Sequence, residues 1–233
     1  MMTRVKCITL GCKVNQAESE GLVEFGRRKE IVVVGAHQPA DLCIINTCAV
    51  TGKAAMQSRQ AIRKAIRNNP GAVIAVTGCY AQNDPETLGA IEGIDYIIGQ
   101  SQKHRLYEIV DVAGEKAGTQ PVVIHDAIRQ QRGFHPMPAP AIGSRTRPFL
   151  KIQDGCDAFC TYCIVPHTRG RSRSLPPDKA LAEFWQLIAA GAQEIVLSGI
   201  HLGCCGHDLD PPTGLLALLQ QMDQIDSTVR IRL

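Results

Sequence analysis

Repeated alternation of strand and helix is the feature of this sequence that most constrains its fold. Five short apolar runs predict buried strands. They are residues 5–10, 41–46, 72–77, 94–98 and 121–124. Helical patterns separate them at residues 16–29, 51–69 and 103–112. Repeated βα units predict a parallel sheet with helices on its faces, so residues 1–118 are expected to form an α/β domain.

Two of the expected helices have recognisable starting signals. Glu18 and Glu20 lie near the expected start of the first helix, where the helix dipole favours acidic side chains. Thr51 is expected to cap the second helix, which Pro70 and Gly71 end.

A segment without periodicity separates this region from the rest of the chain. Pro136, Pro138 and Pro140 alternate with small residues there. We therefore predict a linker at residues 119–143, followed by a second domain at residues 144–233.

The second domain repeats the α/β pattern. Strands are expected at residues 148–152, 194–198 and 229–233, and helices at 178–190 and 215–222. A closed (β/α) barrel has eight such units in about 250 residues. We therefore expect only the first part of a barrel, an incomplete domain.

Three cysteines with C-x3-C-x2-C spacing follow the first strand of this second pattern. Cys156, Cys160 and Cys163 can hold three irons of a cubane cluster, and the loop supplies no fourth thiolate. An iron with an open position can bind substrate or cofactor. A zinc site completed by His167 is the alternative, although zinc sites usually pair two such cysteines with a distant second pair.

Three further cysteines each follow a predicted strand. Cys12, Cys48 and Cys79 should converge, because the loops after parallel strands gather at one edge of the sheet. Each of the three could instead be a small buried hydrophobe, which is how we interpret Cys7 and Cys43 inside strands. The adjacent pair Cys204 and Cys205 is interpreted as a variable loop.

Basic residues are clustered rather than abundant. The formal net charge of +3 does not by itself indicate a nucleic-acid partner. Arg169, Arg171 and Arg173 follow the cysteine loop and are candidates for RNA phosphate contact. The helix at residues 51–69 carries five basic residues and no acid, which an anionic partner or a solvated face would explain equally well.

The ten cysteines also bear on the compartment. The start of the chain lacks the apolar core of an export signal, and no run approaches the roughly eighteen apolar residues of a membrane span. We expect a cytoplasmic protein without a membrane partner. Clustered thiols there serve metal binding or catalysis more often than disulfides.

The cysteine loop resembles the cluster loop of the radical S-adenosylmethionine enzymes, and with the first domain added the chain resembles the methylthiotransferases. The matching segments extend along nearly the whole chain. They are Gly11-Cys12-Lys13-Val14-Asn15-Gln16, Ile45-Asn46-Thr47-Cys48-Ala49-Val50-Thr51, Ser58-Arg59-Gln60, Thr77-Gly78-Cys79-Tyr80-Ala81-Gln82, Lys151-Ile152-Gln153-Asp154-Gly155-Cys156 and Arg169-Gly170-Arg171-Ser172-Arg173-Ser174. The first and last segments most resemble the branch that acts on threonylcarbamoyladenosine in tRNA.

The resemblance implies a methylthiotransferase domain followed by a partial TIM barrel of the radical S-adenosylmethionine type, with two 4Fe-4S clusters. The cluster on Cys156, Cys160 and Cys163 would bind S-adenosyl-L-methionine and, on one-electron reduction, generate a deoxyadenosyl radical. The auxiliary cluster would carry the sulfur to be inserted. Its ligands would be Cys12, Cys48 and Cys79.

Further contacts are implied in the same way. Tyr162 sits where the family contacts the adenine of S-adenosylmethionine, and Ser198 and Gly199 sit where it contacts the methionyl part. The substrate would be tRNA, and the product the 2-methylthio derivative of the modified adenosine beside the anticodon. A flavodoxin-like or ferredoxin-like electron donor is implied, whereas the sulfur source is not.

Other interpretations remain open at this point. The resemblance also covers branches that act on isopentenyl-adenosine in tRNA or on a ribosomal-protein aspartate. A truncated, non-catalytic iron–sulfur protein that binds RNA is a further alternative. Family members are about twice as long and end in an RNA-binding domain that is absent here, so we expect little or no turnover from this chain alone.

Overall fold

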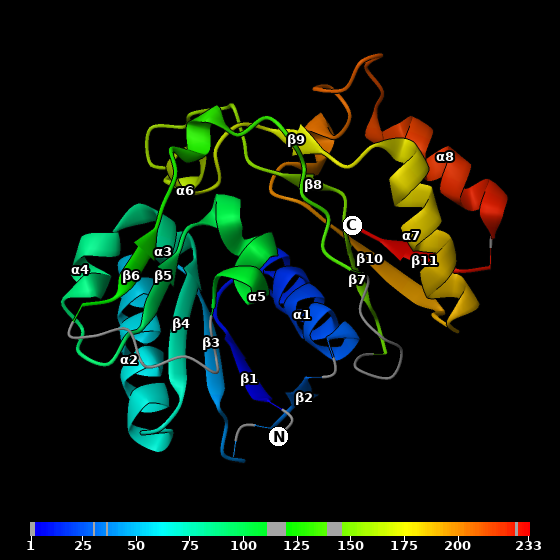
Figure 1. The fold of residues 1–233 in the computed structure, drawn as a ribbon. Helices are drawn as coiled ribbons and strands as arrows, with labels where there is room; N and C mark the ends of the chain where they lie inside the picture. The colour runs from blue at the N-terminus through cyan, green and yellow to red at the C-terminus, as the bar shows by residue number, and fades with distance from the viewer. Residues whose placement is uncertain (1–2, 30, 36, 111–119, 139–145, 227) are drawn as a thin grey trace.

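Six parallel strands form the main sheet of the first domain, in the order β2-β1-β3-β4-β5-β6 (Figure 1). The computed structural model describes residues 3–29, 31–35, 37–110, 120–138, 146–226 and 228–233. The strands are β1 (Arg4–Thr9), β2 (Val32–Val33), β3 (Leu42–Thr47), β4 (Val73–Gly78), β5 (Tyr96–Ile98) and β6 (Val122–Ile124). The predicted parallel α/β architecture is confirmed, and the short edge strand β2 is an addition to it.

Helices cover both faces of this sheet. They are α1 (Lys13–Arg28), α2 (Gly52–Asn68), α3 (Cys79–Asn83), α4 (Pro85–Gly89), the 3-10 helix η1 (Gln100–Arg105) and α5 (Leu106–Ile109). Successive residues of a strand point to opposite faces. In β3, Ile44 therefore packs in a core with Leu22 of α1, whereas Ile45 packs in the other core with Ile62 of α2.

The start of α1 differs from the prediction in a way that matters for the site. The helix begins at Lys13, three residues before the expected start, and its first turn contains no acidic residue. Glu18 therefore lies beyond the first turn, where the helix dipole no longer stabilises an acidic side chain appreciably. Its role is described below from its contacts. The cap of α2 is confirmed, since the Thr51 side chain accepts a hydrogen bond from the Ala54 amide at 3.1 Å.

The strand predicted at residues 121–124 is present as β6, which lies inside the range 119–143 assigned to the linker. It pairs with β5 in parallel, and the Gly99 and Val122 amides connect the two segments through backbone hydrogen bonds. A 3-10 helix, η2 (Ile128–Gln130), follows and contacts the second domain. Residues 139–143 of the predicted linker lie outside the described residues.

The second domain has three parallel strands in the order β11-β10-β7. They are β7 (Phe149–Lys151), β10 (Glu194–Ser198) and β11 (Arg230–Arg232), with α7 (Pro177–Ala189) and α8 (Leu215–Ile225) between them in sequence. Between β7 and α7 lie β8 (Gln153–Asp154), α6 (Val165–Arg169) and β9 (Arg173–Ser174), and the 3-10 helix η3 (Leu202–Cys204) follows β10. The expected opening of a (β/α) barrel is confirmed.

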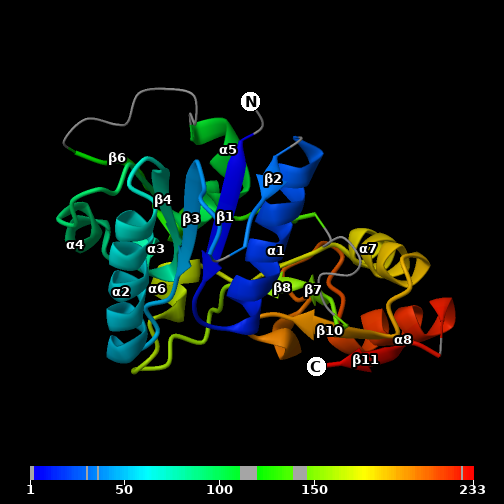
Figure 2. The same ribbon diagram turned by 90° about the horizontal axis from the view of Figure 1, so that it is seen from below.

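The two domains meet along α1 and α6. Helix α1 contacts β7, and α6 packs on α3 at the sheet edge where the parallel strands end (Figures 1 and 2). The loop that carries Cys156, Cys160 and Cys163 precedes α6, so it is held close to this edge. In the described part of the chain, none of the helices has the length and apolar character required to cross a bilayer.

Candidate metal centre

Cys12, Cys48 and Cys79 lie just after three neighbouring strands, β1, β3 and β4. Because these strands are parallel and in register, their ends place the three residues at the same edge of the sheet. A Cβ atom at Gly11 would stand 2.9 Å from the Cys48 sulfur, so the backbone before Cys12 approaches Cys48 closely. Cys12 is exposed, whereas Cys48 and Cys79 are buried.

The thiol of Cys48 lies in the electrostatic field of the two other thiols. Burial raises the pKa of the Cys48 thiol most, and the nearby Cys79 and Cys12 raise it further. The guanidinium of Arg169 acts in the opposite direction. Gln100 of η1 donates to the Cys79 sulfur at 3.4 Å. The predicted convergence of these cysteines is thus present in the structure.

Glycine is required directly before Cys79. Gly78 has a φ of +98°, a left-handed conformation that residues with a side chain rarely adopt. A Cβ atom there would stand 2.4 Å from the Thr47 carbonyl oxygen on the neighbouring strand. The strand can therefore turn into α3 and present Cys79 only with glycine at this position.

The second group of cysteines lies on the loop between β8 and α6. Cys160 is exposed, and Cys156 and Cys163 are half-buried. The Cys156 amide donates to the Gly170 carbonyl at 3.0 Å, and the Cys163 amide donates to the Cys160 carbonyl at 2.9 Å. The first bond ties the start of the loop to the residue after α6, and the second forms a tight turn between Cys160 and Cys163.

The residues expected to contact S-adenosylmethionine fall into two environments. The Tyr162 side chain is 90% exposed on the loop. Ser198 is buried at the end of β10, and Gly199 follows it. A Cβ atom at Gly199 would stand 3.0 Å from Gln153 Oε1, so this turn lies against the start of the cysteine loop.

Gln153 joins these two segments, a role that the sequence analysis missed. Its Oε1 atom accepts hydrogen bonds from the Ile200 and His201 amides, both at 2.8 Å. Its Nε2 atom donates to the Gly155 carbonyl at 2.8 Å and to Ser172 Oγ at 3.0 Å. One buried amide therefore fixes the loop after β10 against the loop that bears Cys156.

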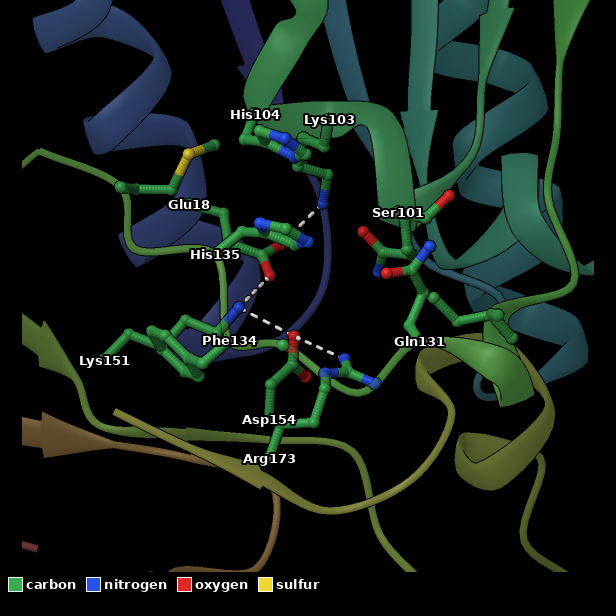
Figure 3. Close-up of a pocket in the computed structure, with 14 residues that line it drawn as sticks. Glu18, Ser101, Lys103, His104, Gln131, Phe134, His135, Lys151, Asp154 and Arg173 are labelled. Carbon is green, nitrogen blue, oxygen red and sulfur yellow. Dashed lines mark hydrogen bonds and ion pairs between the residues drawn. The ribbon is translucent and has the colours of Figure 1, made fainter. Parts of the chain in front are cut away.

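Buried charges connect α1 to the segment around α6. Glu18 binds Lys103 and Lys151 at 2.6 Å each, and Arg169 at 2.9 Å. Asp154 binds Arg169 at 2.8 Å and Lys151 at 2.7 Å. Figure 3 shows Glu18, Lys103, Lys151 and Asp154 at a pocket between the domains. The three cations hold the pKa of the Glu18 carboxyl well below its ordinary value, despite the opposing effect of burial.

This arrangement corrects the expectation for Arg169 and Arg173. Their side chains are 1% and 8% exposed, because they pair with buried carboxylates inside the protein. They therefore do not present a surface to RNA in this structure. Arg171 between them is exposed and keeps its status as a candidate contact.

The other cysteines and the histidine of the zinc alternative have different roles. Cys43 lies in the core, and burial raises the pKa of its thiol. His167 is exposed, with its ring edge toward Phe159 at a centroid distance of 6.1 Å. Cys204, interpreted from the sequence as part of a variable loop, lies in η3 near Cys156: its sulfur is 3.4 Å and the Cys156 sulfur 3.8 Å from His201 Nδ1.

Both triads consist of cysteines alone. Thiolates are the ligands that hold iron–sulfur clusters, so the donor atoms of each triad fit such a cluster. Within the described ranges, no three His, Cys, Asp or Glu side chains are close enough together to hold a single metal ion.

Two family models match this chain in succession. The uncharacterized protein family UPF0004 matches residues 4–99. The radical SAM superfamily matches residues 150–203. The first match contains Cys12, Cys48 and Cys79, and the second contains the loop with Cys156, Cys160 and Cys163.

Curated relatives match along the whole chain. The threonylcarbamoyladenosine tRNA methylthiotransferase MtaB of Bacillus subtilis is 40% identical over 100% of this chain and 51% of its own length. The tRNA-2-methylthio-N(6)-dimethylallyladenosine synthase of Clostridium botulinum is 33% identical over 96% of this chain and 50% of its own. The chain thus spans about half the length of these relatives.

Solved structures share the fold. The radical S-adenosylmethionine methyltransferase TsrM from Kitasatospora setae, with cobalamin and a [4Fe-4S] cluster bound, superimposes with a TM-score of 0.56. The match covers 98% of this chain and 54% of that one, at 13% identity. This similarity shows that the fold of the two consecutive α/β domains also occurs in a protein of solved structure.

Proposed function

Since the chain belongs to the radical S-adenosylmethionine methylthiotransferase family, we propose that it contributes the catalytic half of a tRNA-modifying enzyme. The reaction would convert threonylcarbamoyladenosine beside the anticodon to its 2-methylthio derivative. The observation that carries the proposal is the convergence of Cys12, Cys48 and Cys79 at the sheet edge over which the second cysteine loop is held.

Each triad would hold one 4Fe-4S cluster. Together with S-adenosyl-L-methionine, these clusters would supply one-electron reduction, hydrogen abstraction, and the sulfur and methyl groups of the product. The chain's own residues position these groups. Gly78 sets the direction of Cys79, and Gln153 ties the Cys156 loop to the turn at Gly199, which with Tyr162 and Ser198 would bind S-adenosylmethionine.

Exposed basic side chains support an RNA substrate. Helix α2 carries basic residues and no acidic one, and most of their side chains are exposed. They are Lys53, Arg59, Arg63, Lys64 and Arg67. Arg171 adds one exposed cation beside the second cysteine loop. Such side chains bind phosphates whatever the base sequence, so they would orient tRNA without selecting the modified base.

Iron content tests the two-cluster part of the proposal. After anaerobic reconstitution with iron and sulfide, we expect about eight irons per chain, and about half of that when either triad is changed to Ala. Zinc in place of iron, or a content that only one triad affects, would contradict it.

The substrate needs a separate test. The gene for this protein should be expressed in cells that lack their own methylthiotransferases. We expect the tRNA isolated from those cells to contain 2-methylthio-threonylcarbamoyladenosine after digestion to nucleosides. Mass spectrometry of the nucleosides provides the readout. Methylthiolation of isopentenyl-adenosine alone would favour the alternative suggested by the Clostridium botulinum relative. A flavodoxin-like or ferredoxin-like protein as electron donor stays a prediction.

A further inference from the structure

Glu18 is the centre of a group of buried charged side chains that lies outside both cysteine triads. Its carboxylate is 4% exposed and accepts from three cations: Lys103 at 2.6 Å, Lys151 at 2.6 Å and Arg169 at 2.9 Å. The cations come from η1, β7 and α6, so one carboxylate joins three elements of both domains to α1.

The charges of this group do not balance. Asp154 adds a second carboxylate, which shares Arg169 and Lys151 and also lies 3.7 Å from Arg173. Four cations on two carboxylates leave a formal charge of +2. All six side chains are 13% exposed or less. Buried charge is costly unless an opposite charge compensates it, so the excess points to a neighbouring anion.

The group reaches the first cysteine triad through two asparagines. Arg169 Nη2 donates to Asn15 Oδ1 at 2.5 Å, and Asn15 in turn donates to the Thr47 carbonyl directly before Cys48. Lys103 Nζ donates to Asn46 Oδ1 at 3.1 Å, two residues before Cys48.

The same 3-10 helix contacts the triad from the other side. Gln100, three residues before Lys103, donates to the Cys79 sulfur at 3.4 Å. The positive group therefore lies directly behind the backbone that presents the cysteines. Three thiolates with an iron–sulfur cluster would be the anion that its charge requires.

We propose that these six side chains, which we call the Glu18 ion group, position the auxiliary cluster and raise its reduction potential through their net positive charge. This rests on the proposed function, in which Cys12, Cys48 and Cys79 bind that cluster. Net charge and hydrogen bonds around the sulfurs set the potential of such clusters. Lys103 and Glu18 act as positioning residues, since Lys103 binds the Asn46 side chain two residues before Cys48, and Glu18 binds Lys103.

The potential of the auxiliary cluster tests the inference. In a chain with Cys156, Cys160 and Cys163 changed to Ala, only this cluster would remain, and a redox titration followed by electron paramagnetic resonance would report it alone. Glu18→Gln removes a negative charge and should shift the potential in the positive direction. Lys103→Met removes a positive charge and should shift it in the negative direction.

Matched controls and a second pair of variants separate charge from folding. Glu24→Gln, on the same helix but paired with the exposed Arg27 and Arg28, should leave the potential unchanged. Asp154→Asn and Lys151→Met should repeat the positive and negative shifts. Equal potentials in all variants, or shifts of one sign, would overturn the inference.

The outcome also distinguishes this inference from the proposed function. If the parent chain with only the first triad binds no iron, the proposed function fails and the inference fails with it. If the parent and the Glu24→Gln control bind about four irons and the opposite shifts are missing, the inference alone fails. Loss of iron from all four ion-group variants, with the control loaded, would show a purely structural role and would also overturn it.

Discussion

Replacing Arg169 by Met should destabilise the protein far more than the same change at Arg171. The two residues are two positions apart and carry the same side chain. Arg169 is 1% exposed and binds Glu18, Asp154 and Asn15, whereas Arg171 is exposed. The comparison therefore isolates burial and ion pairing from residue type.

The expected loss of unfolding free energy follows from the side chains that lose a hydrogen-bond donor when Arg169 is replaced. Its guanidinium donates to Glu18 Oε1 at 2.9 Å, to Asp154 Oδ1 at 2.8 Å and to Asn15 Oδ1 at 2.5 Å. Removing one partner of a buried ion pair typically costs about 3–5 kcal/mol. Since Lys103 and Lys151 still neutralise Glu18, we expect a value near the lower end, about 3 kcal/mol. Arg171→Met should change the unfolding free energy by less than about 0.5 kcal/mol.

Urea unfolding measures the difference. With an m value of about 2–3 kcal/mol/M, a loss of about 3 kcal/mol lowers the midpoint by about 1–1.5 M. Circular dichroism follows both domains, and the single tryptophan, Trp185 in α7, follows the second. Because Arg169 binds residues of both domains, both signals should shift. Equal midpoints for the two variants would refute the reasoning.

Four further predictions follow from the contacts of single side chains. Neighbouring cations hold the pKa values of Glu18 and Asp154 below their ordinary values, so the stability they contribute is complete above about pH 5 and is lost as the pH falls toward the folded-state values. Urea midpoints should therefore fall between about pH 5 and about pH 3, and less so in Glu18→Gln. Burial raises the pKa of Glu183 to about 7, so stability should fall between about pH 4.5 and 7 as this carboxyl ionises, and Glu183→Gln should flatten the pH dependence measured by thermal unfolding. Asn15→Leu leaves the Leu10 and Thr47 carbonyls without their donor at 2.7 and 3.0 Å, and should lower the iron bound by the first triad while the second stays loaded. Gly78→Ala forces a side chain against the Thr47 carbonyl and should likewise lower that iron content, whereas Gly71→Ala, where an added Cβ meets nothing within 4 Å, should not.

The fold class, and the position of three cysteines at one edge of the sheet, could be predicted from local sequence patterns. Period and turn signals are local, so the apolar runs around Ile44 and Ile74 and the Thr51 cap could be identified from neighbouring residues alone. The three cysteines after β1, β3 and β4 could be placed at one edge, because parallel strands connected by helices leave little choice of direction.

The contacts of the charged residues, by contrast, could not be predicted from local patterns. The sequence predicts Glu18 to be an acidic residue stabilised by the helix dipole, and Arg169 to be a candidate RNA contact. Both predictions rest on the residues next to them in the chain. Their pairing joins positions 151 residues apart, and no periodicity or spacing encodes such a contact. A charge can be buried only with partners that folding brings together. The Glu18 ion group therefore exists only where the two domains are in contact, and its members lie far apart in the sequence.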